Sequence, residues 1–120
     1  MTYDEIKNIL DNISDPALKL EMVMDIGKNL SPAPNGVLCS EITGCASRVE
    51  ICRIKNQFYG TADSAIVRGI VAIIISMVDG KTPDEIRKMD LTQMFNDLNL
   101  NIGAGRLNGV NSMIRFFKNL

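Results

Sequence analysis

The segment that most constrains the fold is Ala65–Val78, the most hydrophobic stretch of the chain, in which Arg68 is the only charged residue. It is too short to span a bilayer, which takes about 20 apolar residues. Asp63 or Ser64 can cap the start of a helix and Gly80 can end it, so this punctuation favours a helix over a buried strand. A helix that is apolar on all sides belongs in the middle of a core.

Residues that start helices occur both before this segment, near the N-terminus, and after it, toward the C-terminus. Thr2 and Glu5 form a capping box for a first helix, and Asp15 followed by Pro16 opens a second helix that runs to about Lys28. Three more helices are predicted: one near residues 83–89, opened by a capping box of Thr82 and Glu85, one near 91–98, capped by Asp90, and one near 107–117. The last of these follows a glycine-containing break at 103–105 and has an apolar face made of Leu107, Val110, Met113, Ile114 and Phe117.

Between the second helix and the apolar segment, three short runs have the composition of β-strands. Residues 37–42 and 49–54 flank a loop of small residues and predict a β-hairpin, and residues 58–62 predict a third strand. A small antiparallel sheet with helices packed on one side is an α+β fold. The length of 120 residues fits a single domain, residues 1–120.

The absence of histidine excludes more chemistry than any other count. Without it, the chain has no Ser-His-Asp triad, no Cys-His dyad and no His-containing zinc motif. Thirteen Lys and Arg against fourteen Asp and Glu give a net charge of −1, which predicts neither nucleic-acid nor membrane binding. Three cysteines and no apolar leader indicate the cytoplasm, where thiols stay reduced.

Cys45 is the leading candidate for a reactive residue. It follows Gly44 at the tip of the predicted hairpin, among small residues that let a partner approach the sulfur. The alternative is an inert, buried thiol, and position alone weighs the two about equally. Cys39 and Cys52 fall within the predicted strands, where core filler is the commoner role. If the hairpin pairs symmetrically about Cys45, they would be cross-strand neighbours, so a disulfide or a metal pair is conceivable.

Two arginines sit near predicted helix starts. Arg106 has a charge that opposes the dipole of the last helix, so a nearby thiolate or carboxylate could be its partner, although a solvated side chain is the default. Arg68 is close enough in sequence to Asp63 to predict an ion pair.

Four segments, which together cover nearly the whole chain, resemble motifs of the SufE family of sulfur-acceptor proteins. Residues 41–49 (EITGCASRV) resemble its G-C-x-S-x-V loop, and residues 106–114 (RLNGVNSMI) resemble its final helix. Residues 62–73 (ADSAIVRGIVAI) and 79–86 (DGKTPDEI) resemble the start of its core helix and the turn that follows.

The resemblance implies the α+β fold shared with the IscU scaffold, with Cys45 as the persulfide acceptor and Gly44, Ser47, Asp63 and Arg106 as supporting residues. It also implies a SufS-type cysteine desulfurase as partner, whose turnover the chain would stimulate. The sulfur would then pass onward for iron–sulfur cluster assembly, with a SufBCD-type scaffold complex as one receiver. The pyridoxal phosphate (PLP) belongs to that partner. This chain would be a carrier and activator without a tightly bound cofactor, as a monomer or homodimer.

Persulfide transfer needs a thiolate and an accessible loop but no imidazole, which suits a chain without histidine. We expect Arg106 to lower the pKa of Cys45 or to steady its persulfide anion. The chain departs from the family pattern at Glu50, where tryptophan is usual, and at residues 103–105, where a Ser-Pro turn is usual. These departures leave the packing beneath the loop and the approach to Arg106 open.

Two other functions remain as alternatives. The first is an IscU-like iron–sulfur or metal scaffold that uses Cys39, Cys45 and Cys52, although the usual histidine ligand is missing. The second is a thiol-redox protein, which would need a resolving cysteine beside Cys45, and no CxxC motif supplies one.

Overall fold

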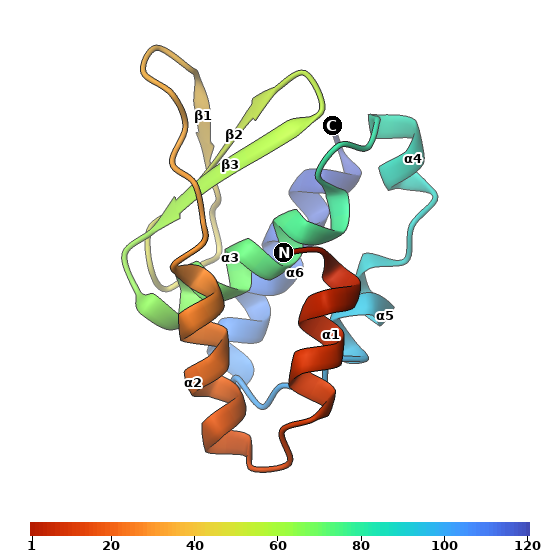
Figure 1. Cartoon of the computed structure of the whole chain (residues 1–120). Coiled ribbons are helices and arrows are strands. Elements are labelled where there is room, and N and C mark those ends of the chain that lie inside the picture. The colour runs from red at the N-terminus through yellow and green to blue at the C-terminus, as the bar shows by residue number, and fades with distance from the viewer.

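A computed structural model describes residues 1–120 as six helices and one three-stranded sheet (Figure 1). The elements are α1 (Tyr3–Asp11), α2 (Pro16–Gly27), β1 (Cys39–Glu41), β2 (Val49–Ile54), β3 (Gln57–Ala62), α3 (Ala65–Val78), α4 (Pro83–Arg87), α5 (Leu91–Asn96) and α6 (Ala104–Lys118). The helices lie to one side of the sheet, so the α+β fold predicted from the sequence is confirmed.

Helix α3 is the central element, as its apolar sequence predicts. Ten of its fourteen residues are buried, and its N-cap is Ser64, whose hydroxyl accepts the amide hydrogen bond of Val67. Its C-terminal end is tied to the sheet, because Asp79 Oδ1 accepts the amide hydrogen bond of Phe58 at 2.9 Å. Around α3 the apolar side chains of the helices and of one sheet face form one continuous core.

Two glycines let α2 cross α3 at very short range. A Cβ built on Gly69 of α3 would lie 2.0 Å from the carbonyl oxygen of Val23, and one built on Gly27 of α2 would lie 2.6 Å from the amide nitrogen of Gly69. Only glycine fits where one helix backbone rests on another.

The sheet has the order β1-β2-β3, and both pairs are antiparallel. Alternate residues of β3 are buried (Phe58, Gly60 and Ala62), which turns one face toward α3. A Cβ on Gly60 would lie 2.9 Å from a methyl carbon of Val71, so α3 lies directly on this strand. Strand β1 is an edge strand, and all three of its residues are exposed.

Several element boundaries differ from the sequence prediction. Strand β1 begins at Cys39 rather than at residue 37, and Leu38 is 93% exposed, because an edge strand is ordered only where its single partner pairs with it. Helix α6 begins at Ala104, inside the predicted break, because Gly103 alone, at φ 83°, makes the turn into the helix. Leu107, expected on the buried face, is 42% exposed.

The helices α4 and α5 end earlier than predicted, at Arg87 and Asn96, although both N-caps, Thr82 and Asp90, are confirmed. The predicted ion pair between Arg68 and Asp63 is wrong. The Arg68 guanidinium instead donates to the carbonyl oxygen of Ala62 at 3.4 Å, which keeps it at the start of α3. None of the helices has the length and apolar character that crossing a bilayer requires.

Candidate functional site

Cys45 lies in the loop of residues 42–48 that joins β1 to β2, which we call the Cys45 loop. The loop is anchored at its start by Ile42, which is 7% exposed and whose amide donates to the carbonyl oxygen of Val49 at 2.9 Å. Gly44 then turns the chain at φ +88°, a conformation that side chains rarely adopt. A Cβ on Gly44 would lie 2.4 Å from Ser112 Oγ, so the loop rests directly on α6.

The thiol of Cys45 is free and half-buried against α6. Its Sγ lies 3.8 Å from the carbonyl oxygen of Gly109, to which it donates a weak hydrogen bond. A Cβ on Gly109 would lie 3.1 Å from the same sulfur, so the glycine makes room for the thiol. The thiol is therefore sheltered, but it is held only by weak, reversible contacts.

A cavity of about 150 Å³ opens beside the thiol, between the Cys45 loop, the start of α3 and the start of α6. Its lining combines small polar groups with apolar side chains and one cation: Cys45, Ala46, Ser47, Ser64, Val67, Ile70, Gly105, Arg106, Gly109 and Met113. Cys45, Ser47 and Arg106, which were singled out from the sequence, thus meet at one cavity.

The expected electrostatic effect of Arg106 on the thiol is not found. Burial raises the pKa of Cys45 above its usual value, because removal from water disfavours the thiolate. The Arg106 guanidinium donates to the carbonyl oxygen of Ile102 at 3.3 Å and is exposed. The prediction that Arg106 lowers the pKa of Cys45 is therefore wrong for this arrangement, in which desolvation outweighs a cation directed elsewhere.

Asp63 lies outside the cavity. It is exposed, and its amide donates to the carbonyl oxygen of Arg48 at 3.2 Å. The hydrogen bond to Glu50 is the main cause of the raised pKa of Arg48, and the charge of Asp63 adds to it. The neighbouring Ser64 lines the cavity in its place. Sequence reasoning also missed Gly109 and Ser112, which contact the loop from α6. Their only signal was their place within the final-helix motif.

The raised pKa of Cys45 predicts how its reactivity depends on pH. The thiolate is the nucleophile, so the alkylation rate should reach half of its maximum above pH ~8.5, the value for a free cysteine. Intact-mass measurement of iodoacetamide labelling would follow this, with the urea-unfolded chain as control, since Cys45 is its only free thiol. A folded midpoint at or below the unfolded one would contradict the prediction.

The raised pKa of Cys45 also makes the free energy of unfolding depend on pH. Because the folded pKa of Cys45 is raised, the unfolded chain ionises first. The contribution of the neutral thiol is fully present below the unfolded pKa and is lost as pH rises through the folded pKa.

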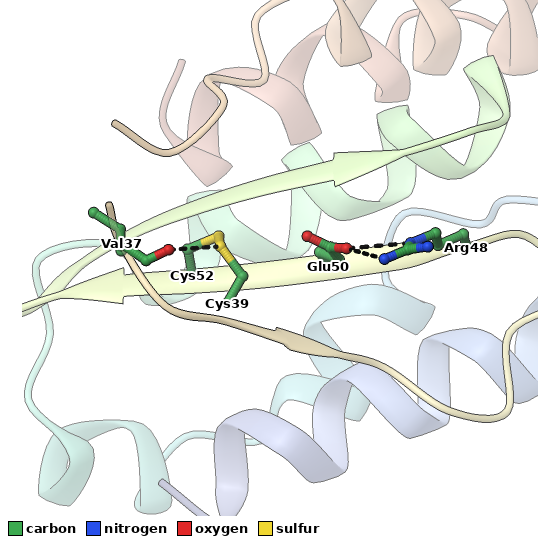
Figure 2. Close-up of a disulfide and its surroundings, with 5 residues drawn as sticks. All are labelled: Val37, Cys39, Arg48, Glu50 and Cys52. Atoms are coloured by element: carbon green, nitrogen blue, oxygen red, sulfur yellow. Dashed lines mark hydrogen bonds and ion pairs between the residues drawn. A yellow bond between two sulfur atoms is a disulfide. The ribbon is translucent and has the colours of Figure 1, made fainter. Parts of the chain in front are cut away.

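The other two cysteines form a disulfide, so the expectation that all three thiols are free is wrong. Cys39 and Cys52 are paired across β1 and β2, with Cα atoms 4.2 Å apart (Figure 2). This is close to the spacing of a non-hydrogen-bonded pair in an antiparallel ladder, about 4.5 Å. The symmetric pairing about Cys45 that the sequence suggested is what brings them together.

The disulfide also bears on the scaffold alternative. Two of the three thiols that a metal would need are bonded to each other. No group of three or more Cys, Asp or Glu side chains is placed to hold a metal ion. The arrangement does not favour an iron–sulfur or metal scaffold built on Cys39, Cys45 and Cys52.

Comparison with solved structures supports the fold. The solution structure of a hypothetical protein from Thermus thermophilus superposes with a TM-score of 0.72, covering 99% of this chain and 94% of that one, at 12% identity. At this identity the match establishes the architecture alone.

Comparison with known sequences identifies the family. An uncharacterized SufE-like protein of Rhizobium meliloti is 35% identical over 80% of this chain and 77% of its own length. An uncharacterized SufE-like protein of Haemophilus influenzae is 32% identical over 85% of this chain and 88% of its own. The sulfur acceptor protein CsdE of Escherichia coli is 27% identical over 94% of this chain and 83% of its own. Residues 4–120 match the family model described as the SufE Fe-S metabolism associated domain, and the chain therefore belongs to the SufE family.

Proposed function

We propose that this chain is a sulfur acceptor, in which Cys45 takes the terminal sulfur of a persulfide held by a SufS-type cysteine desulfurase. The Cys45 thiolate attacks the terminal sulfur, and a new S–S bond forms to Cys45 Sγ. The bond between that sulfur and the donor cysteine breaks, and the donor cysteine leaves as a thiolate. The partner's PLP supplies the chemistry of C–S cleavage, so the transfer step needs no cofactor on this chain.

One observation carries the proposal: the free thiol of the chain lies in a loop that is held to α6 by weak contacts. In the sheltered position burial raises its pKa, which keeps the thiol protonated and unreactive. If the loop leaves α6, the sulfur enters water and regains an ordinary pKa, so it becomes a nucleophile where a partner can reach it. Family membership and the E. coli sulfur acceptor among the relatives support the same role.

The supporting residues would act either on the Cys45 loop while it rests on α6 or on the persulfide that Cys45 carries. Gly44 provides the backbone turn that lets the loop rest on Ser112. Ser47 and Arg106 line the cavity beside the sulfur, where the hydroxyl, and the guanidinium once it turns from the Ile102 carbonyl, can stabilise a persulfide anion. Asp63 is bonded to Arg48 through its backbone amide and would help to hold the end of the loop.

The finer steps extend the same proposal. The chain stimulates the desulfurase, because removal of the sulfur frees the donor cysteine for another turnover. It then passes the sulfur to a receiver for iron–sulfur cluster assembly, such as a SufBCD-type complex. The proposed activity belongs in the cytoplasm, and its chemistry requires no second copy of the chain.

Desulfurase turnover provides the test. Alanine formation by a SufS-type desulfurase with PLP, cysteine and a thiol reductant, which takes the sulfur from the Cys45 persulfide as sulfide, should rise several-fold as the wild-type chain is added. The Cys45→Ser variant should leave the rate at that of the desulfurase alone, with an unchanged thermal midpoint as evidence of folding. Equal stimulation by the variant would exclude Cys45 as the acceptor.

A further inference from the structure

The strand that leads into the Cys45 loop has little noncovalent support. β1 is three residues long, is an edge strand and buries none of them. Its register places Glu41 directly opposite Glu50, and like charges in that position destabilise a strand pair. Arg48 offsets part of this repulsion through an ion pair with Glu50 at 2.6 Å. Beyond its short ladder and the bond from Ile42 to Val49 that extends it, the β1–β2 pair has one further strong contact.

That contact is the disulfide between Cys39 and Cys52, which closes the far end of the same pair. Figure 2 shows it on one side of the β1–β2 ribbon, with Arg48 and Glu50 toward the other end of β2. The two cysteines are 13 residues apart in sequence, so the covalent ring they close contains β1, the whole Cys45 loop and the start of β2. Cys45 lies near the middle of this ring.

We propose that the Cys39–Cys52 pair is a reducible thiol–disulfide site that sets how firmly the Cys45 loop is held. Its reaction partner is a dithiol reductant, either a small dithiol or a protein dithiol. One thiolate of the reductant attacks a sulfur of the pair, forms a mixed disulfide with that cysteine and releases the other cysteine as a thiolate. The second thiolate of the reductant then attacks the reductant's own sulfur in the mixed disulfide and releases the remaining cysteine. Two protein thiols and one oxidised reductant result, so two electrons and two protons are transferred.

The two sulfurs differ in access. Cys39 is exposed at the sheet edge, whereas Cys52 is 3% exposed, so a reductant reaches the Cys39 side first. The carbonyl oxygen of Val37 lies 3.7 Å from Cys39 Sγ and is placed to accept the hydrogen of the thiol after reduction. Reduction removes the covalent closure and leaves β1 on its weak pairing. The strand then separates more often, and the loop that follows it leaves α6 more often.

The consequence for sulfur transfer rests on the proposed function, but the switch does not. In the oxidised chain the loop is restrained and Cys45 stays sheltered. In the reduced chain Cys45 is exposed for a larger fraction of the time, and the acceptor loads faster. The rate at which Cys45 accepts sulfur would thus rise with the supply of dithiol reductant.

The test measures alkylation of Cys45 in three forms of the chain. The first is oxidised wild type and the second is wild type reduced with dithiothreitol and freed of it, with the labelled cysteine located by peptide mass. The third is Cys39→Ser/Cys52→Ala, in which Cys45 is the sole thiol. Labelling of Cys45 should be about tenfold faster in the second and third forms than in the first.

A matched control separates local release from general loss of stability. Ile86→Ala removes side-chain volume from the fully buried Ile86 of α4 and leaves the disulfide intact, so it should leave Cys45 labelling at the oxidised rate. Equal labelling in all forms overturns the proposal, and so does faster labelling of Ile86→Ala. Three free thiols in air-oxidised protein overturn it as well. If labelling responds as expected but a desulfurase loads no sulfur, the switch stands and the proposed function fails.

Discussion

The Gly69→Ala variant is expected to lose about 3 kcal/mol of unfolding free energy, the largest loss expected for alanine at any glycine of this chain. The new Cβ would lie 2.0 Å from the carbonyl oxygen of Val23 and 2.7 Å from its side chain. The obstacle is the backbone of α2, so no side-chain rotation relieves it, and the two helices must separate. Because α3 carries the core, the thermal midpoint should fall by about 10 °C.

Gly105→Ala is the matched control for this variant. Gly105 lies in the first turns of α6, and a Cβ there meets nothing within 4 Å. Alanine is the better helix former, by about 1 kcal/mol, so this variant should be as stable as the wild type or slightly more stable. Equal midpoints for Gly69→Ala and wild type would show that α2 and α3 do not meet as closely as described.

The Gly44→Ala variant is expected to release the Cys45 loop and to raise the alkylation rate of Cys45 about tenfold. Gly44 has φ +88°, where alanine is strained, and its new Cβ would also displace Ser112 Oγ. The strain is present only while the loop rests on α6, so it shifts the equilibrium toward the open loop. Iodoacetamide labelling followed by intact mass would report the change.

Gly80→Ala provides the same backbone strain at a distant site. Gly80 has φ +80°, and a Cβ there meets nothing within 4 Å. Gly80→Ala should lower the free energy of unfolding by about as much as Gly44→Ala does, while Cys45 labels at the wild-type rate. If both variants label alike, the conformation of Gly44 does not hold the loop closed.

Much of the fold follows from local sequence signals. The boundaries of α3 are those that its apolar run and flanking caps predict, and the capping boxes at Thr2 and Thr82 form as expected. These elements could be predicted because their signals are short-range: a side chain bonds a backbone amide three residues away. The boundaries of β1 could not, because an edge strand depends on pairing with a distant segment.

The site could be predicted only in part. Cys45, Ser47 and Arg106 do meet at one cavity, but the direction of the Cys45 pKa shift was reversed. Sequence spacing brings a cation near a thiol, whereas burial and the competing acceptor at Ile102 are properties of the packed structure. Gly109 likewise shows its role only once α6 is placed against the loop.

The pairing of Cys39 with Cys52 was predicted correctly as a cross-strand contact, but the bond between their sulfurs was not. The spacing about Cys45 made Cys39 and Cys52 cross-strand neighbours, and the register confirms this. A cytoplasmic location nevertheless predicts reduced thiols, and the structure has a disulfide between these two cysteines instead. Glu50, at a position where the family usually has tryptophan, pairs with Arg48 on the sheet, so this departure places an ion pair where the family has an aromatic ring.

The most direct test of the central claim is the intact mass of the chain after incubation with a SufS-type desulfurase, PLP and cysteine. The account predicts that the wild-type chain gains the mass of one sulfur atom, which dithiothreitol removes and peptide mapping places on Cys45. It predicts no gain for Cys45→Ser. Added sulfur on the Cys45→Ser variant, or none on the wild type, would contradict the assignment of Cys45 as the sulfur acceptor.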